Sequence, residues 1–368
     1  MDTRLWLAVA AALIVAGAVI GVRLDRAPDT APRPIPAPTA GADEANAAAR
    51  EAAVPSAFGT EDELCAEYQA LAARQALDES KRTPAEETAA RNTLLASQSP
   101  EVLASVALLS QDPAERMDAM TRAMATGRRD ATVAWSAVLI CDSAPADLQC
   151  PAQEWEDELL TLDKENSQVW IRVAASRYEQ GDFVKALDAL HRAAAAAETR
   201  EYMVETVQMV ERALDSAGGY SFPERSRLAF AIAAANLPAY AAYVSMCEKE
   251  SEYDAEWAQA CFEYGQRVER QAKTMTGVSI AQAIEIAALD ALKSSEEAEA
   301  VAARKQEAER DRELQSSDPL AEKVILSNPR HFAAYLALIK EQGELAAGAQ
   351  LRAEASRIAE RCLPKPRG

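Results

Sequence analysis

The sequence predicts an all-α protein, and three features of its composition support this fold class. Hydrophobic residues make up 49% of the 368 residues, while aromatic residues make up only 5%. Alanine, the strongest helix former, supplies much of the apolar content. Runs that alternate apolar and polar positions with β-branched or aromatic side chains are nearly absent. We therefore expect a large hydrophobic core that lies between helices.

The N-terminal residues predict a membrane anchor. Residues 1–4 form a short tail, and the uncharged run 5–22 would form a helix about 27 Å long, close to the thickness of a bilayer core. The run is longer than the apolar region of a cleaved signal peptide, so we expect an uncleaved signal anchor. Arginines flank it on both sides, but a short N-terminus before a long acidic domain favours export. We expect a single-pass protein of the inner (cytoplasmic) membrane with most of the chain in the periplasm.

Residues 23–58 predict a linker rich in proline and alanine. Closely spaced prolines favour the polyproline II conformation, which would make this segment a semi-rigid stalk. A PxxP ligand for another domain is the alternative, although few basic residues accompany the prolines. The prolines concerned are Pro28, Pro32, Pro34, Pro36 and Pro38.

Residues 59–293 predict a helical-repeat domain in which helices alternate with short turns. Thr83 and Asp112 each precede a proline and stand three residues before a glutamate, Glu86 and Glu115. In this pattern the first side chain caps the helix and the glutamate reaches back to its backbone N–H. We therefore expect a capping box at the start of both helices.

The clearest pattern within this domain runs over residues 167–198. It consists of large, small and turn-forming residues at helical spacing: Trp170, Ala174, Tyr178, Gly181, Ala186, Leu190 and Ala193. This pattern resembles one tetratricopeptide repeat, a helix–turn–helix unit of about 34 residues. The resemblance implies that small side chains let the two helices approach closely, that larger ones fill the remaining space, and that a glycine forms the turn.

A single repeat of this kind cannot bury its apolar face alone, so neighbouring repeats are required. Degenerate copies surround Trp135 and follow Asn328. The resemblance therefore implies a right-handed superhelical array of antiparallel helix pairs, a TPR-like α-solenoid, behind the transmembrane helix.

Two further segments complete the chain. Residues 294–317 are charged nearly all round, which predicts a solvated helix or a linker. A coiled-coil partner surface is the alternative, but its a and d positions are not kept apolar. Residues 318–364 predict a C-terminal helix pair.

The six cysteines include no CxxC pair and are accompanied by only two histidines, so zinc sites and thioredoxin-like chemistry are not expected. Their even number suits disulfides outside the cytoplasm. Cys141 with Cys150 and Cys247 with Cys261 would each join neighbouring helices across a short connection. Cys65 and Cys362 could pair only if the ends of the domain meet, which an open solenoid forbids. The alternative is that some of these cysteines are small buried hydrophobic residues.

Function is the least specified property of the sequence. The net charge of −19 comes without a basic stripe, so we expect no nucleic-acid partner. No catalytic motif, cofactor loop or metal-ligand spacing is present, and His191 and His331 carry no pattern of a general base. We expect a scaffold or adaptor that is not an enzyme, needs no cofactor and binds a protein or peptide partner. The alternatives are a structural or stress-related envelope protein without a partner groove, and an all-α enzyme that uses dispersed carboxylates.

Overall fold

The computed structural model describes Phe58 and residues 60–74, 83–126, 130–145, 148–314 and 319–362. All of them belong to the compact unit Ser56–Gly368. The predicted tail 1–4, the predicted anchor 5–22 and the predicted linker 23–58, apart from Phe58, lie outside the described residues.

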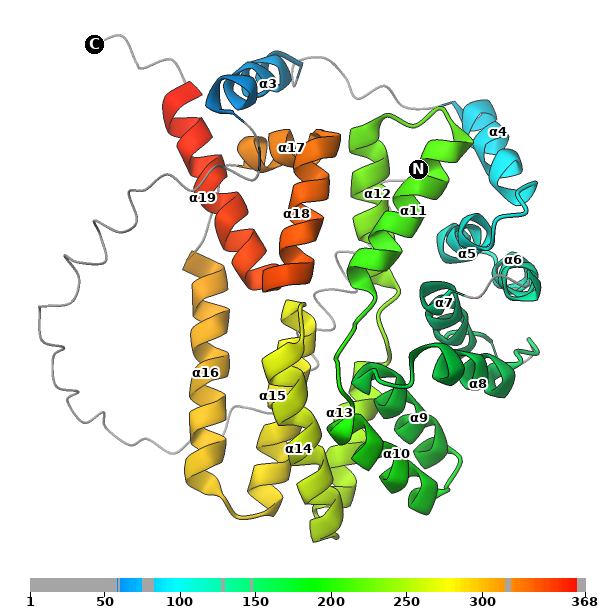
Figure 1. Ribbon diagram of the computed structural model, residues 1–368, viewed down its shortest axis with the longest axis vertical. Helices are drawn as coiled ribbons and strands as arrows, with labels where there is room; N and C mark the ends of the chain where they lie inside the picture. The colour runs from blue at the N-terminus through cyan, green and yellow to red at the C-terminus, as the bar shows by residue number, and fades with distance from the viewer. Residues whose placement is uncertain are drawn as a thin grey trace, which may run out of the picture. The chain divides into compact units, whose positions relative to one another are not determined.

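The described residues form an all-α fold, which confirms the predicted class (Figure 1). Their one isolated β-bridge runs in parallel between Asn166 and Glu198. The helices are α3 (Glu61–Arg74), α4 (Pro84–Leu95), α5 (Pro100–Leu109), α6 (Pro113–Ala125), α7 (Ala131–Asp142), α8 (Ala152–Asp163), α9 (Ser167–Glu179), α10 (Phe183–Ala195), α11 (Met203–Ala217), α12 (Phe222–Ala235), α13 (Tyr240–Ser251), α14 (Ala255–Gln271), α15 (Met275–Ala291), α16 (Ser295–Leu314), α17 (Pro319–Ser327), α18 (Pro329–Gln342) and α19 (Glu344–Cys362).

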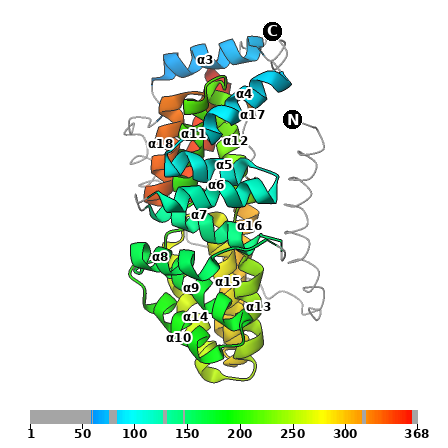
Figure 2. The ribbon, with the colours of Figure 1, turned by 90° about the vertical axis from the view of Figure 1, so that its right-hand side faces the viewer.

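Helices that follow one another along the chain pack against each other. The pairs include α5 with α6, α7 with α8, α9 with α10, α11 with α12, and α14 with α15. Figure 2 shows α5 to α10 in chain order from the upper to the lower part of the view. Contacts of α6 with α7 and of α8 with α9 connect one pair to the next. Sequential packing of paired helices is thus the main feature of the N-terminal half of the described chain.

Of the two capping boxes predicted from the sequence, the one at Thr83 is present and the one at Asp112 is incomplete. The backbone N–H of Thr83 donates to the Glu86 carboxylate at 2.8 Å, and the hydroxyl of Thr83 accepts from the N–H of Glu86 at 3.3 Å. Asp112 also caps its helix. The prediction of a second complete box is wrong, because the Glu115 carboxylate binds the guanidinium of Arg91, with Nε at 3.0 Å, instead of reaching back to Asp112.

The two short-range disulfides expected from the sequence are present. Cys141 at the end of α7 bonds to Cys150 in the connection before α8, with 5.6 Å between the Cα atoms. Cys247 of α13 bonds to Cys261 of α14, with 5.8 Å between the Cα atoms. Each bond therefore joins two helices that are neighbours in sequence, or one helix to the connection that leads to the next.

A third disulfide joins Cys65 of α3 to Cys362 of α19, with 5.2 Å between their Cα atoms and a sequence separation of 297. The expectation that these two cysteines stay apart is wrong. The helices beyond α10 turn back toward the beginning of the domain, because α11 packs against α4 and α5, and α12 packs against α17. The helix α3 consequently lies against both α17 and α19 (Figure 1).

The C-terminal region contains more helices than the predicted pair. Residues 318–364 include α17, α18 and α19, because Asn328 caps a new helix that has Pro329 in its first turn. The charged segment forms α16, which lies along α15 (Figure 1). Its residues Ala298 and Val301 are buried against Leu289 of α15. A small apolar side of α16, together with the ion pair of Arg304 with Glu269 of α14 at 2.8 Å, holds this otherwise charged helix.

One apolar stretch, Phe222–Ser251, has the length and the mean hydropathy, 1.4, of a membrane span. Length and composition alone are weak evidence, and the stretch consists of two helices, α12 and α13, with Pro238 between them. Ala229 of α12 and Met246 of α13 are fully buried in the core of the folded unit. Both helices therefore contribute side chains to that core, while 28% of the apolar window is buried.

Candidate functional site

The residues that carry the repeat resemblance lie at the packing surface between α9 and α10. Ala174, Ala186, Leu190 and Ala193 have no exposed surface. Gly181 forms the turn with a φ of +78°, a conformation that side chains other than glycine rarely adopt. These positions hold two helices together and expose no group to a ligand.

The two aromatic residues of this pattern make polar contacts at its edges. The indole N–H of Trp170 donates to the carbonyl of Lys164 at 2.6 Å, and the guanidinium of Arg192 lies 4.9 Å from its ring centroid. The hydroxyl of Tyr178 donates to Glu250 of α13 at 2.8 Å. Burial and the Glu250 carboxylate raise the pKa of Tyr178 to about 12. Both aromatic residues thus connect the α9–α10 hairpin to its neighbours.

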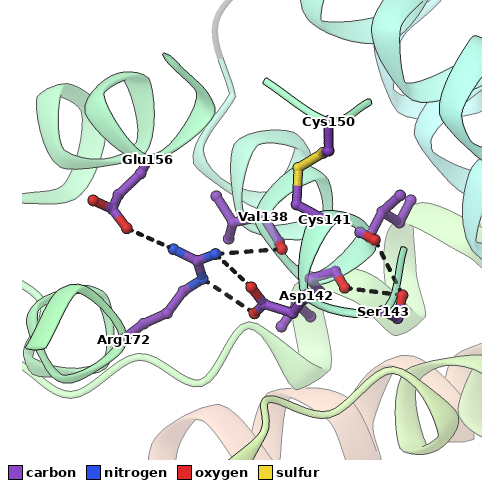
Figure 3. The surroundings of a disulfide bond; sticks show 9 residues. Val138, Cys141, Asp142, Ser143, Cys150, Glu156 and Arg172 are labelled. Carbon is purple, nitrogen blue, oxygen red and sulfur yellow. Dashed lines mark hydrogen bonds and ion pairs between the residues drawn. A yellow bond between two sulfur atoms is a disulfide. The ribbon is translucent and has the colours of Figure 1, made fainter. Parts of the chain in front are cut away.

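A buried ion cluster lies beside the Cys141–Cys150 disulfide (Figure 3). The guanidinium of Arg172 donates to Glu156 at 2.9 Å and to Asp142 at 2.6 Å. A second guanidinium, that of Arg177, lies 2.7 Å from Glu156. Burial raises the pKa of Glu156, and the two guanidiniums offset only part of that effect. Since every charge in the cluster is paired, we interpret it as a structural link between α7, α8 and α9.

Each of the two histidines lies near a carboxylate in the described part of the chain. His191 is exposed and lies 3.4 Å from Glu256, while the ring of His331 is buried 3.7 Å from Glu67. Within the described ranges, no group of three or more His, Cys, Asp or Glu side chains could hold a metal ion.

The best candidate for a binding site is a cleft of about 510 Å³ with three walls. The first wall is formed by residues 197–205, which lead from the end of α10 into the first turn of α11. The second wall consists of residues at the end of α14 and in the turn before α15, namely Arg270, Gln271, Lys273 and Thr274, and the third consists of Ile339 and Lys340 of α18. We call it the junction cleft. Its volume lies within the range of ligand-binding pockets.

A non-helical segment forms the first wall, and Asn166 fixes its position. The side-chain carbonyl of Asn166 accepts from the backbone N–H of Arg200 at 2.9 Å, and its amide donates to the carbonyl of Arg200 at 3.0 Å. Tyr202 ends the segment in the left-handed conformation, with a φ of 57°. Its buried ring stacks on Trp135 at 5.0 Å, and its hydroxyl donates to Asp163. These contacts compensate for a backbone conformation that is unfavourable for tyrosine.

Glu201 joins the first wall to the second. Its carboxylate accepts from the backbone N–H groups of Lys273 and Thr274, both at 2.8 Å, and from the Thr274 hydroxyl at 2.6 Å. A Cβ atom on Gly277 would lie 1.9 Å from this carboxylate, so the close approach requires glycine. Burial raises the pKa of Glu201, and the donors at the start of α15 offset only part of that effect.

The third wall is held to the second by the turn between α18 and α19 (Figure 1). The backbone N–H of Glu344 donates to the carbonyl of Lys273 at 2.5 Å, and the Glu344 carboxylate accepts from the N–H of Met275 at 2.8 Å. The ammonium of Lys273 donates to the carbonyl of Glu341 at 3.0 Å. The cleft is therefore assembled from segments that lie far apart in the sequence.

The charges that line the junction cleft are mostly paired within the protein. Arg200 lies 2.8 Å from Glu198, and Lys340 lies 3.0 Å from Glu205. Arg270 is the exception: its side chain is exposed and forms no hydrogen bond or close ion pair with any described residue, and it interacts only at longer range with Glu285 of α15. An anionic group in the cleft would therefore find an available guanidinium.

Comparison with protein-family models, with curated proteins and with solved structures gives no match to this chain. The structure itself establishes an all-α protein of sequentially paired helices with three disulfides. Three disulfides and no free cysteine among the described residues indicate an oxidising compartment outside the cytoplasm.

Proposed function

We propose that this protein is a membrane-anchored scaffold that binds a protein or peptide partner outside the cytoplasm, and that the junction cleft is its binding site. The observation that carries the proposal is the cleft itself, with its non-helical wall and its available guanidinium, Arg270. Its rigid backing suits binding, because recognition is tighter when the site is pre-organised.

The finer architecture in this proposal is a TPR-like array. It is supported by the repeat pattern at residues 167–198 and by the sequential packing of α5 to α10. Proteins built from such repeats bind partners along the surfaces that neighbouring helix pairs form together. The bond between Cys65 and Cys362 closes the described helices into a covalent loop.

Attachment to the inner membrane rests on the uncharged run 5–22, and a periplasmic location rests on that run together with the disulfides. A reporter fused after Gly368 tests the topology. A fusion that is active only in the cytoplasm would contradict the proposed export.

Binding is tested in living cells with a photo-crosslinking amino acid at Ala197, which is exposed in the cleft wall. The matched control places the same amino acid at Arg212, which is exposed on α11 and does not line the junction cleft. We expect a discrete crosslinked species from position 197 and not from position 212. Equal crosslinking at both positions, or none at either, would contradict the assignment of the cleft.

A further inference from the structure

The first wall of the junction cleft has a strand-like edge. The backbone N–H of Glu198 donates to the carbonyl of Glu165 at 3.0 Å, and the carbonyl of Glu198 accepts from the N–H of Ser167 at 2.8 Å. The N–H of Arg200 faces the same side, where it donates to the side chain of Asn166. One edge of this segment is thus fully used in holding the wall to the start of α9.

The opposite edge of the same segment has no partner. In an extended chain, backbone groups point alternately to the two sides, so those of Thr199, between Glu198 and Arg200, face away from Asn166. Ala197 forms the bend that precedes this stretch. Among the described residues, no hydrogen bond joins the N–H or the carbonyl of either residue to the protein. Both residues line the junction cleft. Unpaired N–H and carbonyl groups in a row are a template for another strand.

From these contacts we infer that the junction cleft binds an extended peptide segment that carries a carboxylate, and that the peptide pairs with the free edge at Ala197 and Thr199 while Arg270 binds its carboxylate. The inference rests on the proposed function and adds the binding mode and the chemistry of the partner.

Three properties of the cleft favour this occupant. The stretch 197–201 covers about 13 Å when extended, which is enough for a strand of four or five residues. Arg270 offers a planar guanidinium that can bind a carboxylate through two parallel hydrogen bonds. Met203, which is partly exposed, adds apolar surface for a side chain of the peptide, while the fully buried Ile339 lies behind the cleft surface. A helical segment would use none of the free backbone groups, because its own N–H and carbonyl groups are already paired.

The test uses the purified full-length protein and a fluorescent acetylated heptapeptide of alternating valine and glutamate, with binding followed by anisotropy. One comparison peptide has lysine in place of glutamate, and a second has proline at alternate positions, so that it cannot form a strand ladder. We expect the valine–glutamate peptide to bind at least tenfold more tightly than either comparison peptide. No binding, or equal binding of all three peptides, would overturn the inference.

Variants of the protein locate the contacts. Ala197→Pro removes the N–H that the peptide would use, and Ala196 already has φ −57° and ψ 147°, a conformation that a following proline accepts. We expect this variant and Arg270→Glu each to weaken binding about tenfold, the effect of one lost hydrogen bond or ion pair. Arg212→Glu, at an exposed position outside the cleft, is the matched control for the charge reversal and should bind as the unmodified protein does.

Amide hydrogen exchange of the unmodified protein keeps the test independent of the folding of any variant. Strand pairing predicts slower exchange at Ala197 and Thr199 when the valine–glutamate peptide is present. Binding without this protection would overturn the inference. The two proposals can fail separately. If a partner is crosslinked from position 197 in cells but the peptide experiments fail, the proposed scaffold function stands. Only the inference that the partner is an extended acidic peptide is then refuted.

Discussion

Among single residues, Glu285 of α15 is in the most unusual environment. Its side chain is 1% exposed, and one of its carboxylate oxygens has no hydrogen-bond partner. The neighbouring charged groups are Glu269 of α14, Arg304 of α16, whose Nη2 lies 4.0 Å away, and the more distant Arg270. Burial, followed by repulsion from Glu269, raises the pKa of Glu285 to about 7.

This pKa predicts a stability that depends on pH. Because the pKa of Glu285 rises from the usual 4.5 to about 7 on folding, the folded state binds the proton more tightly. Protonated Glu285 therefore adds to the free energy of unfolding relative to the ionised form. This contribution is fully present below pH 4.5 and is lost as the pH rises through about 7, which lowers the free energy of unfolding by up to about 3 kcal/mol. Because glutamine does not titrate, we expect the free energy of unfolding, measured with urea, to fall less over this pH range for Glu285→Gln than for the unmodified protein. Asp290→Asn, at an exposed position of the same helix, is the control. Parallel curves for the Glu285→Gln variant and the unmodified protein would contradict this prediction.

A second prediction at this scale concerns Gly277, where Glu201 approaches the backbone of α15. Gly277→Ala would place a Cβ atom 1.9 Å from the Glu201 carboxylate, so we expect a loss of about 1–3 kcal/mol in the free energy of unfolding. Gly348→Ala in α19 is the control, because its Cβ would meet only the end of the Arg352 side chain, at 3.1 Å. Equal stability of the two variants in urea would show that the cleft wall is not tightly fixed.

At the scale of helices, the tight packing of α9 on α10 can be tested by adding volume to its centre. Ala186 has no exposed surface between the two helices, whereas Val184 of the same helix is 82% exposed. We expect Ala186→Leu to lower the free energy of unfolding by about 1–3 kcal/mol, since the added atoms have no space. Val184→Leu should change it by less than about 0.5 kcal/mol. Thermal unfolding of both variants checks the prediction, and an equally stable Ala186→Leu would contradict it.

The helices were predictable from the sequence because their signals are local. Caps such as Thr83 and short-range cysteine pairs such as Cys247 and Cys261 depend on residues that are near in sequence. The junction cleft was not predictable, because its walls meet only through long-range contacts such as that of Glu201 with Thr274. The one local signal in the sequence is the non-helical connection between α10 and α11. The Cys65–Cys362 bond was not predicted because it also depends on long-range contacts. The periodicity of the sequence does not specify that α11 packs against α4 and α5.

For the whole molecule, the disulfide between Cys65 and Cys362 closes nearly all of the described chain into one covalent loop. The junction cleft depends on this closure indirectly, because α19 follows the turn at Glu344 that holds α18 against Lys273. The C-terminal helices thus connect the site to the helix that follows the predicted membrane stalk.

Removing this bond tests its contribution to the fold. In the chain-entropy model the cost of losing a cross-link grows with the loop that it closes, which is 297 residues here and 9 residues for Cys141–Cys150. We expect the double variant Cys65→Ser with Cys362→Ser to lose about 5 kcal/mol of unfolding free energy, against about 3 kcal/mol for Cys141→Ser with Cys150→Ser. Urea titration measures both losses, and the slope should steepen more for the first variant, because its unfolded chain exposes more surface. An equal or smaller loss for the long loop would indicate that α3 remains docked on α17 and α19 through side-chain packing alone.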